Sequence, residues 1–230
     1  MPVAPRIVGR VTETSLSPTD RSTIRRGKKR AVTDRAALAE VLDAGFLCHL
    51  GVVREGSPLV LPTCYGRDGD TLYLHGSSGA ASLRAGAGAE VCVTVTHLDG
   101  VVYARSVFNF SANYRSAVVH GRAEPVVEEA AKLHGLRVLT EQIAPGSWDH
   151  ARQPNRRELA ATAVLRLDLT EAAVKIRTGP PVDEEEDLAL PAWAGVLPLH
   201  RSWGTPVPAP ELPEGAGVPA HVQSRTGPVA

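Results

Sequence analysis

The sequence predicts a mainly β protein, in which six short antiparallel strands close into a barrel with helices on its flanks. Three observations lead to this prediction. Apolar and polar residues alternate in several short segments between 47 and 123, Asp-Gly pairs separate neighbouring segments, and helical periodicity is confined to the two sides of this region. Short strands joined by tight turns are typical of antiparallel meanders and barrels rather than of βαβ units. Closure into a barrel also removes exposed sheet edges.

The elements follow from local patterns. A helix is expected over 33–45, where Thr33 or Asp34 can cap its start and Gly45 suits its end. The six strands are expected over 47–53, 58–65, 71–75, 90–97, 101–110 and 114–123, with tight turns at 67–70 and 99–100. Residues 76–88 are rich in Gly, Ser and Ala, which predicts a loop running into a short helix. Further helices are expected over 127–143 and 155–160, and two more strands over 161–169 and 172–177.

Composition limits the classes of partner. With 230 residues and 43% hydrophobic content, the chain can bury a sizeable core. Its formal net charge of zero argues against nucleic acid or an anionic membrane as the main partner. There is no apolar stretch of the roughly 20 residues that span a bilayer, and no signal-peptide pattern in the first 30 residues. Three cysteines without a C-x-x-C pair predict neither a disulfide framework nor a metal site. The expected location is cytoplasmic.

Three segments are expected along the chain. Residues 1–30 are polar and end in a basic run, Arg25–Arg30, which we interpret as a flexible, solvated arm in preference to a phosphate contact. Residues 31–179 form the barrel domain with its flanking helices. Residues 180–230 hold ten of the 18 prolines and are expected to be an extended tail. The apolar patch Trp193–Pro198 should dock this tail on the barrel or on a partner chain.

The loop after the third strand is the clearest candidate for a binding site. Backbone N–H groups of a small-residue loop that enters a helix favour a phosphate. The hydroxyls of Ser77, Ser78 and Ser82 can add donors, and Arg84 can add a charge. An ordinary flexible loop is the alternative. The catalytic motifs G-x-S-x-G, P-loop and H-E-x-x-H are absent, so catalytic residues stay unknown.

Four histidines lie in or at the ends of expected strands, namely His49, His75, His97 and His120. Taken singly, each is more often a packed or hydrogen-bonded residue than a ligand.

The order of short motifs resembles a known family. These motifs are Cys48–Gly51, Leu61–Tyr65, Asp68–Ser77, Val91–Thr96 and Asn113–Ser116. Together they resemble the pyridoxamine 5′-phosphate oxidase-like proteins, which have an FMN-binding split β-barrel, and in particular the branch related to nitroimidazole-resistance proteins. The resemblance covers roughly residues 20–200. It implies a homodimer with two FMN sites at the interface between the chains.

The resemblance also assigns residues to the cofactor. The flavin ring would lie along the strand of Pro62, and its phosphate would lie by the loop that starts at His75. The residues implied to bind FMN are Pro62, Thr63, Cys64, Tyr65, His75, Gly76, Ser77, Ser78, Ser82, Arg84, Arg115, Ser116 and Trp193. One departure concerns the phosphate: where relatives carry a basic residue, this chain reads Gly79-Ala80-Ala81, and Arg84 lies about one helical turn later.

Three functions are open at this point. The first is an FMN-dependent oxidoreductase that acts on an unknown small molecule by hydride transfer, with Tyr65, Arg105 and Arg115 as candidates for holding an anionic substrate. The second is a split barrel that has exchanged FMN for haem or another small ligand, with a strand histidine as the axial ligand. The third is a non-catalytic dimer that binds a small anion, or a partner protein through its Pro-rich tail.

Overall fold

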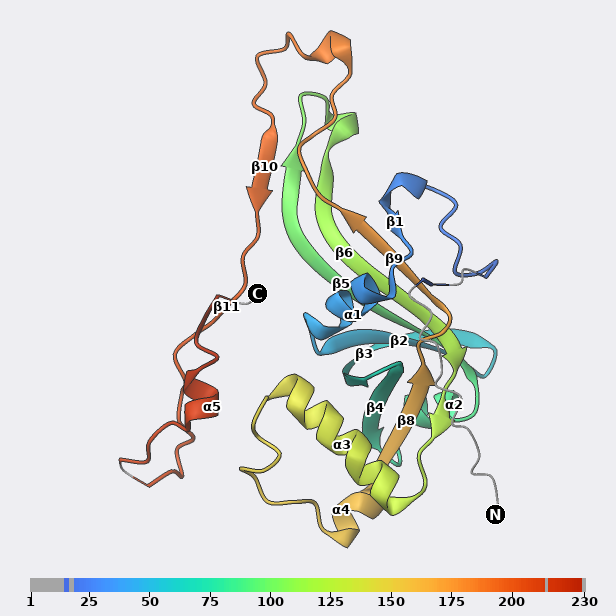
Figure 1. Cartoon of the computed structure of the whole chain (residues 1–230), viewed down its shortest axis with the longest axis vertical. Helices are drawn as coiled ribbons and strands as arrows, with labels where there is room; N and C mark the ends of the chain where they lie inside the picture. The colour runs from blue at the N-terminus through green and yellow to red at the C-terminus, as the bar shows by residue number, and fades with distance from the viewer. Residues whose placement is uncertain (1–14, 17–18, 214, 229–230) are drawn as a thin grey trace, which may run out of the picture.

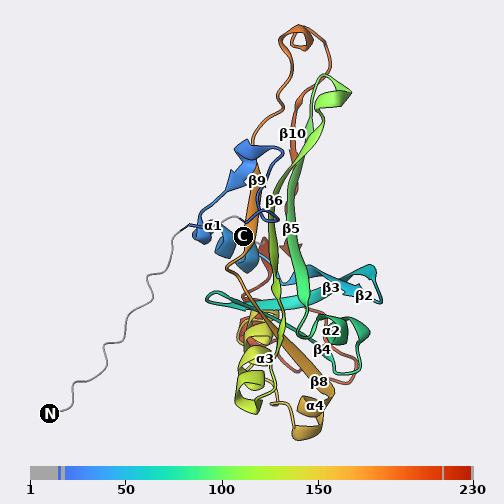
Figure 2. The same cartoon turned by 90° about the vertical axis from the view of Figure 1, so that its right-hand side faces the viewer.

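Six strands form a split β-barrel in the computed structural model, which describes residues 15–16, 19–213 and 215–228. They are β2 (Leu47–Arg54), β3 (Ser57–Asp68), β4 (Thr71–Ser77), β5 (Glu90–Tyr103), β6 (Ser111–Arg122) and β8 (Thr162–Asp168). Their spatial order is β6-β5-β2-β3-β4-β8, and every pair is antiparallel (Figures 1 and 2). The barrel is split within β3, which pairs with β2 up to Cys64 and with β4 from Tyr65 onward. The predicted fold class is confirmed.

Helices cover the flanks of the barrel. α1 (Arg35–Asp43) begins at Asp34, whose carboxylate accepts the N–H of Ala36, and it packs on β5, β6 and β9 (Ala172–Arg177). α3 (Glu129–Ile143) packs across β3 and β4. The other elements are the helices α2 (Ala81–Gly86), α4 (Arg156–Ala161) and α5 (Ala220–Gln223), the strands β1 (Ala31–Val32), β7 (Glu124–Pro125), β10 (Gly195–Pro198), β11 (Ser202–Trp203) and β12 (Gly227–Pro228), and three short 3₁₀ turns at 28–30, 107–109 and 185–187.

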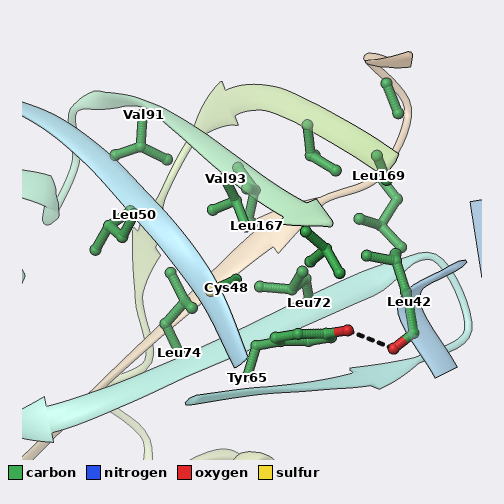
Figure 3. Packing of buried hydrophobic residues seen from close by; sticks show 14 of the residues in the cluster. Leu42, Cys48, Leu50, Tyr65, Leu72, Leu74, Val91, Val93, Leu167 and Leu169 are labelled. Carbon is green, nitrogen blue, oxygen red and sulfur yellow. Dashed lines mark hydrogen bonds between the residues drawn. The ribbon is translucent and has the colours of Figure 1, made fainter. Parts of the chain in front are cut away.

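The core fills the inside of the barrel. Side chains alternate along a strand, so Cys48, Leu50 and Val52 of β2 all point inward and are buried. Tyr65 also points inward and is completely buried, and its hydroxyl donates to the carbonyl of Leu42 at 2.5 Å (Figure 3). This burial raises the pKa of the Tyr65 phenol.

The expected turn at 99–100 is wrong. β5 runs through these residues as one strand with a bulge between Leu98 and Gly100, so the expected separate strands 90–97 and 101–110 are not formed. The chain reverses later, in residues 104–110. A glycine is required at position 100 for another reason. β10 pairs with β5 here, and a Cβ on residue 100 would lie 2.8 Å from the carbonyl oxygen of Leu197.

The β5–β6 hairpin projects beyond the barrel as an arm, and the tail returns along it (Figure 1). β10 pairs with β5, from Gly195 opposite Tyr103 to Pro198 opposite Gly100. Further along, Trp203 stacks on Phe46 of the body.

At the other end of the chain, Leu16 is 5% exposed and belongs to the core, while residues 1–14 lie outside the described part. The segment boundaries predicted from the sequence stay predictions. Within the described residues, no helix combines the length and the apolar character that a bilayer crossing requires.

Candidate functional site

A cleft opens along one edge of β5. β2 covers this edge at Cys92–Thr94 and β10 covers it at Gly100–Tyr103, which leaves the stretch between them free of a strand partner. The cavity at this gap has a volume of about 730 Å³, within the range of roughly 300–1,000 Å³ that is usual for small-molecule sites. It is lined by Asp43, Ala44, Gly45, Phe46, Leu47, His49, Thr96, His97, Gln142, Pro145, Arg201, Ser202, Trp203 and Arg225. We call this cavity the tail cleft, because the tail supplies one wall.

A buried histidine positions one arginine of the tail cleft. His97 is 4% exposed, and its two ring nitrogens lie 2.9 Å from the carbonyl of Val41 (Nε2) and 3.2 Å from Nη2 of Arg201 (Nδ1). Arginine can only donate, so Nδ1 is the acceptor and Nε2 carries the proton that Val41 accepts. Burial lowers the pKa of His97, which keeps the ring neutral, as this arrangement requires.

An aromatic pair and a second arginine complete the cleft. The rings of Phe46 and Trp203 are 6.2 Å apart and inclined by 17°. The guanidinium of Arg225 lies 4.5 Å from the Trp203 ring centroid and donates to the carbonyl of Ile143. Sequence reasoning missed this wall, and the one available signal was Trp203, a tryptophan in a chain with 4% aromatic residues.

The β3 residues assigned to the flavin divide between the two faces of the sheet. In the β2–β3 ladder Pro62 lies opposite His49 and Cys64 opposite Leu47, all on the outer face. Thr63 lies opposite the buried Cys48 and faces inward. Tyr65 faces inward too and its side chain is fully buried, so the expectation that it holds an anionic substrate is corrected.

In the loop after β4, backbone N–H groups already donate hydrogen bonds within the chain, so the side chains are the groups that remain to bind a ligand. The N–H of Ser78 donates to Ala161 and that of Gly79 to the hydroxyl of Ser77. Ser77, Ser78 and Arg84 are exposed, whereas Gly76 and Ser82 are half-buried. Among the described residues, no carboxylate lies within 4.0 Å of the Arg84 guanidinium. An anion at this loop would therefore meet hydroxyls and one unpaired cation.

A second cavity lies beside His75. Its volume is about 320 Å³, and Leu136, Thr140, Trp148 and Arg152 are among its lining residues. The Nδ1 atom of His75 is buried and has no hydrogen-bond partner among the described residues. Burial lowers the pKa of His75, so the ring is uncharged at neutral pH. An uncharged, unpartnered ring nitrogen is what a metal-containing cofactor requires of a histidine ligand.

Arg115, Ser116 and Trp193 do not join the β3 residues in this chain. Arg115 pairs with Asp99 at 2.9 Å on the face that α1 covers, and Ser116 points to the opposite face. Trp193 is 67% exposed and packs against Tyr103 near the end of the arm.

Arg105, proposed from the sequence to hold an anionic substrate, also lies on the arm, where its guanidinium meets the Asp183 carboxylate at 2.6 Å. Arg105 and Arg115 are therefore paired with carboxylates of this chain, and their expected substrate role stays a prediction.

The comparisons with known proteins decide the family. A sequence model described as pyridoxamine 5′-phosphate oxidase matches residues 34–176. This chain belongs to that family. The flavocytochrome Anf3 from Azotobacter vinelandii shares 40% of its sequence with the chain, with a TM-score of 0.87, over 91% of this chain and 98% of the other. The FAD and haem binding protein from Mycobacterium smegmatis shares 41%, with a TM-score of 0.84, over 87% and 98%.

A more distant solved structure supports the fold alone. A proposed 5-nitroimidazole antibiotic resistance protein from Bacteroides thetaiotaomicron has 20% identity and a TM-score of 0.53, over 64% of this chain and 86% of the other. No curated protein matches the chain.

Proposed function

We propose that this member of the pyridoxamine 5′-phosphate oxidase family is a redox protein that binds both a flavin and haem and acts on a small organic substrate. The observation that carries the proposal is the buried, unpartnered Nδ1 of His75 beside a cavity. Support comes from the two relatives at 40% and 41% identity, one a flavocytochrome and the other an FAD and haem binding protein.

The flavin would lie on the outer face of β3. A bound flavin supplies hydride and single-electron transfer. In this chain, Pro62 and Cys64 would form the wall for the ring, and Ser77, Ser78 and Arg84 would hold phosphate oxygens. The sequence leads us to expect FMN. Its terminal phosphate carries two negative charges, and the one arginine at this loop, Arg84, has no carboxylate within 4.0 Å among the described residues. FAD adds contacts through its adenosine half, and it is the flavin named for the Mycobacterium smegmatis relative, so we favour FAD.

His75 is the best placed of the four strand histidines to bind haem iron. His97 already uses both ring nitrogens, and His120 lines neither of the cavities described above. His49 lines the tail cleft but is exposed. Iron in haem supplies a one-electron centre, whose potential depends on the axial ligand and on burial. His75 would provide a neutral nitrogen ligand beside a cavity of mixed lining, in which Leu136 and Trp148 are apolar and Thr140, Arg152 and Glu158 are polar or charged.

The homodimer expected from the sequence is part of the proposal. Phe108 and Val107 at the end of the arm are 92% and 85% exposed, and Val60 on the outer face of β3 is 62% exposed. Val107 and Phe108 are adjacent in the sequence, so together they form an exposed apolar site at the arm tip, and such a site is typical of an interaction surface. A second copy of the chain would cover them and could bring its Trp193 to the flavin.

An absorption spectrum of the purified chain tests the proposal. We expect a flavin band together with a haem Soret band, and acid release followed by mass spectrometry distinguishes FAD from FMN. His75→Ala should abolish the Soret band and spare the flavin, while the matched control His120→Ala should keep both. A preparation without either band, which also fails to take up added flavin and haem, would refute the function. A monomer in light scattering would refute the dimer.

A further inference from the structure

We propose that the tail cleft binds a planar organic anion. This ligand would be the substrate of the flavin site, and only its designation as substrate rests on the proposed function. The cleft itself stands on contacts within the described chain: its charge, its aromatic wall and its place beside the outer face of β3.

The charge in the cleft is positive and is not neutralised. Neither Arg201 nor Arg225 has a carboxylate within 4.0 Å among the described residues. Asp43 is the one acidic residue in the lining, and both of its oxygens are engaged by Arg67 of β3. Two guanidinium groups at one cavity without an acidic partner favour a carboxylate, sulfonate or phosphate.

The guanidinium of Arg201 is held in place before any ligand arrives. The neutral His97 ring accepts one of its N–H groups, and Val41 fixes that ring from the other side. The remaining donors of Arg201 stay available, since arginine has five N–H groups. A group that is already oriented loses less conformational entropy when it binds, which favours affinity.

The shape of the cleft favours a flat ligand. Phe46 and Trp203 are stacked on each other, with ring centroids 6.2 Å apart, and Arg225 stacks on the indole, so these groups form one wall of the cleft and not a slot between two rings. The cavity of about 730 Å³ also has room for a ligand of two or three fused rings. Stacking on the aromatic pair and pairing with the arginines would together select planar anions over neutral or non-planar molecules.

The cleft adjoins the proposed position of the flavin. His49 lines the cleft and lies directly opposite Pro62 in the β2–β3 ladder. Leu47, also in the lining, lies opposite Cys64. A ligand in the cleft would therefore be next to a ring on the outer face of β3.

Calorimetric titration with 2-naphthoate and its neutral isostere 2-naphthamide tests the inference, using the full chain with the cofactors it retains on purification. We expect 2-naphthoate to bind at least about tenfold more tightly than 2-naphthamide. Arg201→Gln and Arg225→Gln should each weaken 2-naphthoate by about tenfold to a hundredfold, as expected for a lost charge-assisted contact. Both variants should leave 2-naphthamide unchanged. The matched control Arg157→Gln, an exposed arginine of α4, should change neither.

Several outcomes would overturn the inference: equal affinity for the two compounds, an Arg157→Gln effect as large as the others, or flavin released by 2-naphthoate, which would make the cleft the flavin's own site. Arg201→Lys keeps the charge and should recover part of the affinity, which separates lost recognition from misfolding. A yellow protein that ignores 2-naphthoate refutes this inference alone. A colourless protein that takes up neither added flavin nor added haem, but binds 2-naphthoate with the expected pattern, refutes the proposed function alone.

Discussion

Replacing Tyr65 with phenylalanine separates a core role for this residue from a cofactor role. The phenol is completely buried, and its hydroxyl donates to Leu42 at the end of α1. Phenylalanine fills nearly the same space, so the substitution removes one hydrogen bond and little packing. We expect Tyr65→Phe to lower the stability of the chain and to leave its affinity for flavin unchanged.

The size of the stability loss in Tyr65→Phe depends on which other group donates a hydrogen bond to the Leu42 carbonyl. Gln142 of α3 donates to the same oxygen at 3.1 Å, so this acceptor keeps a partner when the Tyr65 hydroxyl is removed. The expected cost is therefore that of an ordinary net hydrogen bond, about 1 kcal/mol. For a chain of this size, that corresponds to a fall of roughly 2–4 °C in Tm. Adding Gln142→Leu leaves the carbonyl unsatisfied, and the pair should cost about 1–3 kcal/mol more than the sum of the single changes.

Urea unfolding of the cofactor-free chain measures these differences, and fluorescence titration measures flavin affinity in parallel. Additive costs in the double variant would show that the two donors do not share the Leu42 carbonyl. A large loss of flavin affinity in Tyr65→Phe, at unchanged stability, would refute the placement of this side chain in the core.

Three further perturbations test other parts of the structure. Gly66→Ala should cost about 1–3 kcal/mol, because its Cβ would lie 2.8 Å from the α3 backbone; melting curves should show no loss for Gly204→Ala, which meets nothing within 4 Å. Burial lowers the pKa of both His75 and His97, so stability should be greatest above the ordinary histidine value of 6.5 and fall as acid protonates the unfolded chain first. In unfolding experiments at several pH values this dependence should be shallower for His97→Gln, and an unchanged slope would contradict the assignment. Asp183→Asn removes the charge that Arg105 faces, so limited proteolysis should cut residues 178–194 faster; cleavage at the wild-type rate would show that this pair does not hold the tail.

Local patterns predicted the elements of the barrel well because the period of each pattern follows from which face of the element is buried. The strand over 47–53 and the helix over 33–45 differ from the observed β2 and α1 by few residues. The pair Asp99-Gly100 failed because a glycine that allows a tight turn looks the same in sequence as one that allows a close approach by another strand.

The site was harder to predict because it depends on register and on distant contacts. Whether Tyr65 faces inward is settled by its position in the β3 ladders, which no single segment reveals. The contact between His97 and Arg201 joins residues 104 positions apart. Nothing in the periodicity of either segment points to the other, so the sequence predicted the loop at Ser77 and missed the tail cleft.

The pairing of β10 with β5 has a consequence for assembly. Four residue pairs hold this strand, and residues 178–194 connect it to β9 without any strand of their own. β10 can pair with β5 of its own chain or, in a dimer that exchanges this strand, with β5 of a second copy, and the same four pairs form in both cases. Which arrangement is preferred depends on the effective concentration set by the linker. Arg201 and Trp203 follow β10 closely and would travel with it to the other copy. In a dimer that exchanges β10, a ligand bound in the tail cleft would contact both chains at once. Binding of this ligand would then stabilise the dimer against dissociation.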